Sequence, residues 1–175
     1  MKTVKLLIAF ALSVLLLTSC RTSAFLEYSF DWDKPTVETA YSTVPQKARD
    51  FIADCYPEDS ILSVHNATLW HYKKPAYGID YTDNTSVMFD KKGNWLRMDN
   101  YRYGLPECLL AKVPHIDAMQ KAIADNVAKT NSKPWKIKRI ETHPNGYLVK
   151  IGIGLTIFHY YFDKNGVLKR VAVEI

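Results

Sequence analysis

The chain has 175 residues, of which 47% are hydrophobic and 23% charged, with only 7 glycines and 8 prolines. This composition excludes collagen, a low-complexity linker and an intrinsically disordered chain. Its one long apolar stretch lies at the extreme N-terminus, which excludes a polytopic membrane protein. The formal net charge is +5, and two of those charges are Lys2 and Lys5. The rest of the chain is too weakly basic to indicate a nucleic-acid partner.

Residues 1–20 have the pattern of a bacterial export signal. Lys2 and Lys5 precede an apolar run from Leu6 to Leu17, which is too short for a comfortable membrane span. The run ends in Leu17-Thr18-Ser19-Cys20, which resembles the lipobox of bacterial lipoproteins. That resemblance implies cleavage before Cys20, a diacylglycerol on its thiol and a fatty acid such as palmitate on its new amino group. Two such acyl signals anchor a protein stably in a membrane.

The residue after the lipobox bears on location. Arg21 stands where an aspartate would favour retention in the inner membrane, and no acidic run follows Cys20. By analogy with lipoprotein sorting, we expect an outer-membrane anchor with the domain facing the periplasm. An ordinary signal peptide with an incidental cysteine, or an uncleaved anchor, is the alternative.

Two segments of the chain repeat each other. Phe89-Asp90-Lys91-Lys92-Gly93 matches Phe162-Asp163-Lys164-Asn165-Gly166, 73 residues later, and Val44-Pro45 matches Val113-Pro114, 69 residues later. Each Val-Pro pair precedes a helical pattern, because proline suits the first turn of a helix. We therefore expect four parts: a lipoprotein signal peptide (1–19), the lipidated Cys20 with a tether (20–43), a first repeat (44–104) and a second repeat (105–175).

Within each repeat the apolar spacing changes from helical to strand-like. Apolar residues from Ala48 to Cys55 and from Ile116 to Val127 follow helical spacing. Alternation with a period of two then predicts strands near 61–70, 76–82, 85–90 and 94–100 in the first copy, and near 135–142, 147–153, 155–163 and 167–174 in the second. The aromatics in 21–43 indicate that part of the tether packs on the domain or forms a short strand.

These elements predict an α+β fold of two tandem α-β-β-β-β repeats. Alternating strands are typical of antiparallel sheets with one face on a core. The Phe-Asp-Lys-x-Gly segments are predicted to be hairpin turns, in which the aspartate caps the turn and the glycine adopts a positive φ. The repeats, joined through Gly104-Leu105-Pro106, are expected to form one antiparallel sheet with the helices packed on one face.

The repeat resembles the PepSY-like family related to β-lactamase-inhibitor protein. The features are the two Val-Pro starts, Phe51-Ile52 followed by Tyr56-Pro57, the Phe-Asp-Lys-x-Gly turns and the link at Leu105-Pro106. The resemblance covers about 44–175 and implies a secreted or lipid-anchored protein without catalysis that binds, and sometimes inhibits, another protein. The second copy departs from the pattern, with Asn131 to Trp135 in place of Tyr-Pro.

Three cysteines are present, at positions 20, 55 and 108. If Cys20 carries lipid, Cys55 and Cys108 remain as a pair in an oxidising compartment. A Cys55–Cys108 disulfide and two separate buried thiols both fit the sequence, because spacing alone does not place their Cβ atoms.

Motifs for catalysis, metals and cofactors are missing. The five histidines form no H-E-x-x-H pattern, and no zinc spacing, P-loop, G-x-S-x-G or dinucleotide fingerprint occurs. We therefore expect no catalytic residues, no metal and no cofactor. If the chain were an enzyme, His159 with Asp80 or Asp163 would be the pair to test.

Two surfaces are candidates for binding a partner. The first is the hairpin of Trp70, His71, Tyr72, Lys73 and Lys74, because aromatic and basic residues at a hairpin tip are typical of interface anchors. The second is the sheet face opposite the helices. Strand parity is expected to place there Asp80, Ser86, Met88, Lys150, His159 and Tyr161. Trp95, Arg97 and Arg170 are further candidates for this face, because the turns before their strands leave their parity open. Tyr101-Arg102-Tyr103 forms either a binding ridge or linker packing.

The sequence thus predicts a non-catalytic, lipid-anchored envelope protein that binds, and in one interpretation inhibits, a protein or peptide through the sheet face and the 70–75 hairpin. Its partners would be an envelope protein or peptide and the membrane, through the N-terminal lipid, without nucleic acid. The alternative is a small-ligand binder or sensor with a cavity between the helices and the sheet. A purely structural envelope lipoprotein is a further alternative.

Overall fold

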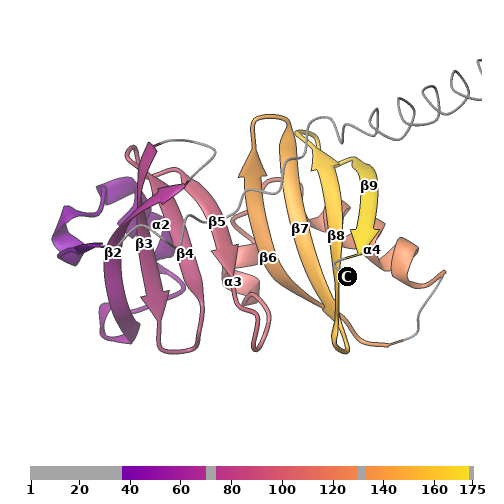
Figure 1. Ribbon diagram of the computed structural model, residues 1–175, viewed down its shortest axis with the longest axis horizontal. Helices are drawn as coiled ribbons and strands as arrows, with labels where there is room; N and C mark the ends of the chain where they lie inside the picture. The colour runs from indigo at the N-terminus through magenta and orange to yellow at the C-terminus, as the bar shows by residue number, and fades with distance from the viewer. Residues whose placement is uncertain (1–36, 70–73, 130–132, 174–175) are drawn as a thin grey trace, which may run out of the picture.

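The computed structural model describes residues 37–69, 74–129 and 133–173. They form one antiparallel sheet of nine strands, in which every strand pairs with its neighbours in sequence, from β1 to β9 (Figure 1). The predicted α+β class, the two tandem repeats and the antiparallel sheet are confirmed. No helix within these residues has both the length and the apolarity that crossing a membrane requires.

The first repeat contains one helix and four strands. Helix α2 (Gln46–Ala53) follows Pro45 directly, as the Val-Pro motif predicts. The strands are β2 (Ile61–Leu69), β3 (Lys74–Tyr81), β4 (Ser86–Asp90) and β5 (Trp95–Asp99). Two short 3-10 turns, η1 (Tyr41–Thr43) and η2 (Glu58–Ser60), flank α2.

The second repeat has the same order of elements. Helix α4 (Ile116–Val127) precedes β6 (Lys136–His143), β7 (Gly146–Ile153), β8 (Thr156–Asp163) and β9 (Leu168–Val173). This helix begins two residues after Val113-Pro114, because His115 adopts a left-handed conformation with a φ of 62°. The β5 and β6 strands join the repeats through three residue pairs, Arg97 with Glu141, Met98 with Ile140 and Asp99 with Arg139.

Two elements lie outside the predicted pattern. Strand β1 (Val37–Glu38) falls within the expected tether and pairs with Asn66 and His65 of β2. The aromatic residues from which packing or a short strand was predicted in this segment lie outside the described residues. Helix α3 (Glu107–Leu110) occupies the connection between the repeats. Its Leu109 and Leu110 are buried, which ties the connection into the core.

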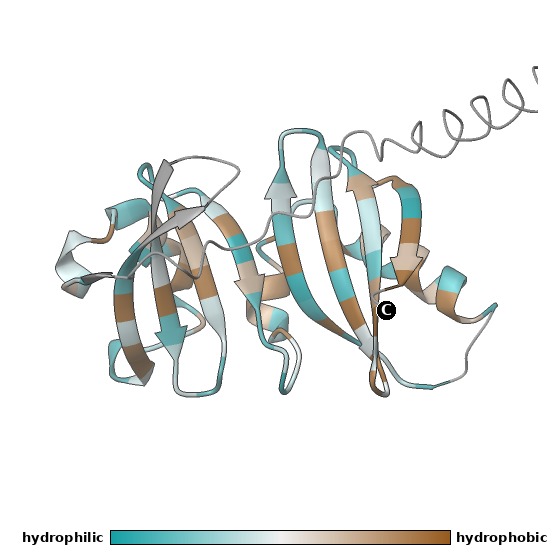
Figure 2. Cartoon of the chain, in the orientation of Figure 1, coloured by the Kyte–Doolittle hydropathy of each residue, from teal (hydrophilic) through white to brown (hydrophobic). Residues whose placement is uncertain are grey.

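The core lies between the helices and one face of the sheet. Ile52 of α2, Met119 and Ile123 of α4, and Phe89 and Phe162 of the strands all belong to one buried cluster. Helices α2 and α4 therefore pack on the same face, as predicted. The strands carry alternating hydrophilic and hydrophobic bands, which is the period of two expected for a sheet covered on one side (Figure 2).

The two Phe-Asp-Lys-x-Gly segments are hairpin turns, as predicted. In the first, Asp90 Oδ1 accepts hydrogen bonds from the backbone N–H of Lys92 at 2.8 Å and of Asn94 at 2.9 Å. In the second, Asp163 Oδ1 accepts them from Asn165 and Val167 in the same way. Burial opposes ionisation of Asp90, but the hydrogen bonds from Asn94 and Lys92 outweigh it and lower the pKa of this carboxyl. Both carboxylates thus accept hydrogen bonds from the backbone of their own turns.

Candidate binding face

On the sheet face without helices, two rows of side chains run across the strands. Because Met98, Ile140 and Val149 point into the core, their neighbours along each strand point the other way. The strand register aligns them as Met88, Arg97, Glu141, Leu148, Tyr161 and Arg170 in one row, and Ser86, Asp99, Arg139, Lys150, His159 and Ala172 in the next. We call these two rows the helix-free face.

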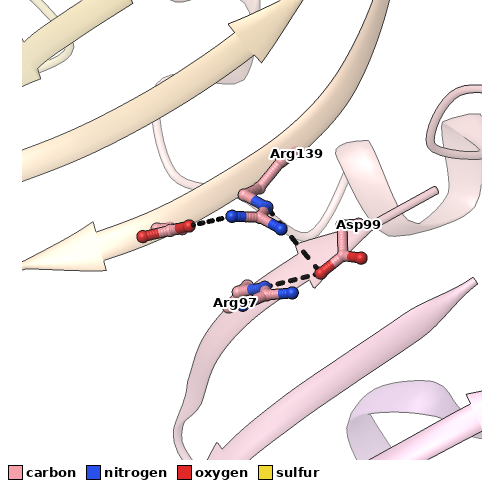
Figure 3. A network of polar contacts seen from close by, with 4 residues as sticks. Arg97, Asp99 and Arg139 are labelled. Atoms are coloured by element: carbon pink, nitrogen blue, oxygen red, sulfur yellow. Dashed lines mark hydrogen bonds and ion pairs between the residues drawn. The ribbon is translucent and has the colours of Figure 1, made fainter. Parts of the chain in front are cut away.

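The helix-free face has a network of ion pairs at the junction of the repeats. Arg97 Nε donates to Asp99 Oδ2 at 2.6 Å along β5, and Arg139 Nη1 donates to Glu141 Oε1 at 3.0 Å along β6. Arg139 Nε lies 3.9 Å from Asp99 Oδ2 and so connects the two strands (Figure 3). The network therefore links charged side chains of both repeats at the β5–β6 junction.

This network is buried although α2 and α4 lie on the other side of the sheet. Arg97 is 6% exposed, Glu141 4% and Lys150 7%. Burial raises the pKa of Glu141, and the charges of Arg139, Arg97 and Lys150 oppose that effect without cancelling it. Buried charges of this kind hold one geometry, because an ion removed from water needs its partners in place.

Two Tyr–Arg pairs lie on or beside the helix-free face, and one of them includes Arg139 of the network. The Arg139 guanidinium lies 4.9 Å from the ring centre of Tyr101, which is 42% exposed. The guanidinium of the exposed Arg170 lies 5.0 Å from the ring centre of Tyr161. Cation–π pairs of this geometry stabilise both side chains, and tyrosine and arginine are frequent anchors of protein interfaces.

The structure places most of the residues predicted for the sheet face. Met88, Arg97, Lys150, His159, Tyr161 and Arg170 all lie in the two rows of the helix-free face. Their role in binding stays a prediction. The predicted set omits Asp99, Arg139 and Glu141, although their strand parity matches that of Arg97 and Lys150. Tyr101 belongs to the Tyr101-Arg102-Tyr103 segment, for which the sequence allows either a binding role or linker packing.

The placement of Trp95 on this face is wrong. Its ring lies 6.5 Å from the ring of Phe51 of α2 and 6.3 Å from that of Tyr147, both nearly parallel to it, and it packs on the core cluster. Phe89 pairs with Trp95 whereas Met88 pairs with Arg97, so β5 has an extra residue between them. This bulge turns Trp95 and Arg97 to opposite faces.

The predicted hairpin site lies at the edge of the described chain. Trp70, His71, Tyr72 and Lys73 fall outside the described residues. Lys74 is the first residue of β3, with its backbone paired to that of Leu69. The binding role of this hairpin therefore stays a prediction.

The histidine–aspartate pair considered for catalysis does not form with Asp80. His159 is on β8, whereas Asp80 is on β3, with β4 to β7 between them in the sheet. Asp80 Oδ2 instead accepts from Ser63 at 2.8 Å and lies 3.4 Å from His65 Nδ1. Asp163 is engaged by its own turn and by Lys169, whose Nζ lies 2.9 Å away. Neither carboxylate is placed as a partner for His159.

The described residues also bear on metal and small-ligand sites. Residues 37–69, 74–129 and 133–173 contain no group of three or more His, Cys, Asp or Glu side chains that could hold a metal ion. A pocket of about 270 Å³ lies beside α2, lined by residues that include Tyr41, Arg49 and Tyr56. It is not between the helices and the sheet, where the side chains of the core cluster pack. The small-ligand alternative therefore stays a prediction.

The fold defines a class of α+β protein in which two helix-plus-four-strand repeats share one sheet. Residues 75–170 match the model of a family described as "Putative beta-lactamase-inhibitor-like, PepSY-like". This match covers more than half of the chain, and the chain belongs to this PepSY-like family. No curated protein matches it.

Solved structures from Bacteroides have the same fold. A "putative periplasmic protein" from Bacteroides vulgatus has 24% identity and a TM-score of 0.62, and the match covers 79% of this chain and 98% of that one. A "putative calcium-regulated periplasmic protein" from Bacteroides thetaiotaomicron has 24% identity and a TM-score of 0.58, with 78% and 96% covered. A second Bacteroides vulgatus "putative periplasmic protein of unknown function" has 20% identity and a TM-score of 0.60, with 79% and 99% covered. At these identities the likeness concerns the fold alone.

Proposed function

We propose that this protein is a non-catalytic, lipid-anchored envelope protein that binds an acidic segment of another protein through the helix-free face. The single observation that carries the proposal is the ion-pair network of Arg97, Asp99, Arg139 and Glu141, with its two Tyr–Arg pairs. Membership of the PepSY-like family, related to a protein inhibitor, supports a binding role.

The charges of the face indicate the chemistry of the partner. The two rows hold four permanent cations, Arg97, Arg139, Lys150 and Arg170, against two carboxylates, Asp99 and Glu141. Arg97 and Lys150 are buried, so the exposed Arg170 is the cation that a partner would meet first. The positive surplus favours a negatively charged partner, since complementary potentials speed and orient association. The exposed Tyr101 and Arg170 make the first contacts, with Tyr101 packed on Arg139 of the network and Arg170 packed on Tyr161.

The N-terminal signal and the similar solved structures support the proposed location in the envelope. Acylation at Cys20 would hold the domain at a membrane, and residues 21–36 leave room for a tether. The similar structures described as periplasmic support a periplasmic position. The 70–75 hairpin, with Trp70 and Tyr72, is a second contact in this proposal.

A binding assay with two designed peptides tests the chemistry of the partner. The probes are a synthetic peptide of alternating Glu and Tyr and its counterpart of alternating Lys and Tyr. Fluorescence anisotropy with the detergent-solubilised full chain should show binding of the acidic peptide only. Arg170→Glu should weaken this binding about tenfold, which corresponds to the roughly 1–2 kcal/mol of an interface anchor.

The matched control carries the same change of charge on the helix side. Lys129 is exposed just after α4, so Lys129→Glu should leave the affinity for the acidic peptide within about twofold of the parent. Equal losses for Lys129→Glu and Arg170→Glu would mean that only net charge matters. That result, or equal binding of both peptides, would contradict a specific site on the helix-free face.

A further inference from the structure

Two cysteines that are 53 residues apart in sequence meet beside the connection between the repeats. Cys55 follows the end of α2 and is half-buried, whereas Cys108 is in α3 and is exposed. The two side chains lie close enough to interact, and no disulfide joins them. The sequence left open whether these residues pair or lie apart, and the structure brings them together.

The surrounding contacts hold the two segments in this position. Lys112 Nζ donates to Asp54 Oδ2 at 3.0 Å, one residue before Cys55. The same ammonium lies 5.6 Å from the ring centre of Phe51 on α2. Leu109, next to Cys108, is fully buried. Packing and charge thus fix α3 against the end of α2, independently of the sulfur atoms.

We propose that Cys55 and Cys108 form an intramolecular disulfide, which links the helix of the first repeat to the connection that leads into the second. The proposal rests on the proposed envelope location for its oxidising surroundings, where such pairs form and persist. Because the two cysteines are neighbours, we expect a side-chain rotation to bring their sulfur atoms to bonding distance.

The order in which the two thiols react with an oxidant follows from the different surroundings of Cys55 and Cys108. Burial raises the pKa of the Cys55 thiol to about 12, and its hydrogen bond with Cys108 adds to this effect. The exposed Cys108 thiolate therefore attacks the disulfide of a dithiol-disulfide oxidant, forms a mixed disulfide and releases one oxidant thiol. Cys55 then gives up its proton, and its sulfur attacks the Cys108 sulfur and releases the second oxidant thiol. Two thiols of this protein are oxidised to one disulfide, and one oxidant disulfide is reduced to two thiols.

A redox titration of the purified full chain tests the pair without any substitution. The detergent-solubilised protein is equilibrated with mixtures of reduced and oxidised glutathione, and its free thiols are then blocked with an alkylating reagent. Peptide mass spectrometry should find Cys55 and Cys108 joined within one chain. Closing this loop should raise Tm by about 5–15 °C relative to the reduced protein, because it restricts the unfolded chain.

The double variant Cys55→Ser/Cys108→Ser is the matched control, and its Tm should be the same under oxidised and reduced glutathione. Glutathione retained on Cys108 alone, or a Cys108–Cys108 crosslink between two chains, would overturn the pairing. Alkylation in intact cells then addresses location separately. If Cys55 and Cys108 form a disulfide with glutathione but stay reduced in cells, the result would contradict the oxidising envelope location. It would not contradict the proximity of the two cysteines.

Discussion

Met98 of β5 lies directly opposite Ile140 of β6, and both side chains are completely buried in the core cluster that the two repeats share. The β5–β6 pairing is short, with three residue pairs. Side-chain packing behind it therefore contributes to holding the repeats together. The repeats are expected to unfold as one unit, since neither a helix nor a small sheet is stable alone.

Replacement of Ile140 by alanine tests this shared core. The change removes buried methyl groups and leaves a cavity at the junction, so the free energy of unfolding should fall by about 2–4 kcal/mol. Urea unfolding followed by tryptophan fluorescence and by circular dichroism should still give one coincident transition. Two separate transitions, or a loss smaller than that of an exposed Leu155→Ala control, would contradict a common core.

Gly166 in the second turn lies against His115, the residue before α4. Its φ is +74°, and a Cβ there would stand 2.7 Å from the Cβ of His115. Gly166→Ala should therefore combine backbone strain with a steric clash and lower the free energy of unfolding by about 2–4 kcal/mol.

Gly154 provides the matched control for this substitution. Its φ is +61°, and no atom lies within 4 Å of a Cβ added there. Gly154→Ala should show only the cost of the left-handed backbone, about 1 kcal/mol. Equal losses in the two variants, measured by urea unfolding, would mean that the packing of the turn against His115 contributes nothing.

The buried Glu141 predicts a particular pH dependence of stability. Burial raises its pKa in the folded protein above the ordinary value of 4.5, so the folded chain keeps this proton to a higher pH than the unfolded chain. The contribution of Glu141 to the free energy of unfolding is then complete below about pH 4.5 and falls as the pH rises through the folded-state pKa.

Glu141→Gln removes this titration and keeps the shape of the side chain. The free energy of unfolding of the parent minus that of Glu141→Gln should decrease between pH 4 and pH 8. Urea titrations at intervals of one pH unit measure this difference. A difference that increases with pH would mean that the Arg139 and Arg97 charges outweigh burial, and that the pKa of Glu141 is lowered.

The fold was predictable because local signals agreed with one another. Val44-Pro45 precedes α2, and the turns at Asp90 and Asp163 separate strands whose apolar residues alternate. These signals depend on neighbours in sequence, and they fix which face of each strand meets the core. Helix α3 was missed because its four residues are too few for a helical period to be visible.

The binding face was predictable only in part, because it depends on register between distant strands. Lys150, His159 and Tyr161 follow from the parity of their own strands. The bulge at Leu96, which turns Trp95 into the core, has no signature in the alternation. The contact between Asp99 and Arg139 requires the exact β5–β6 register across the intervening connection, which strand patterns do not specify.

The central claim is that a partner docks on the helix-free face. A photo-crosslinking amino acid placed at Tyr101, which is exposed beside Arg139, tests it directly in living cells. The control is the same amino acid at Ala124, which is exposed on α4 on the opposite side of the sheet. We predict one dominant crosslinked protein from Tyr101, strongly reduced by Arg170→Glu and absent from Ala124. The same products from both positions, or none from Tyr101, would contradict the account.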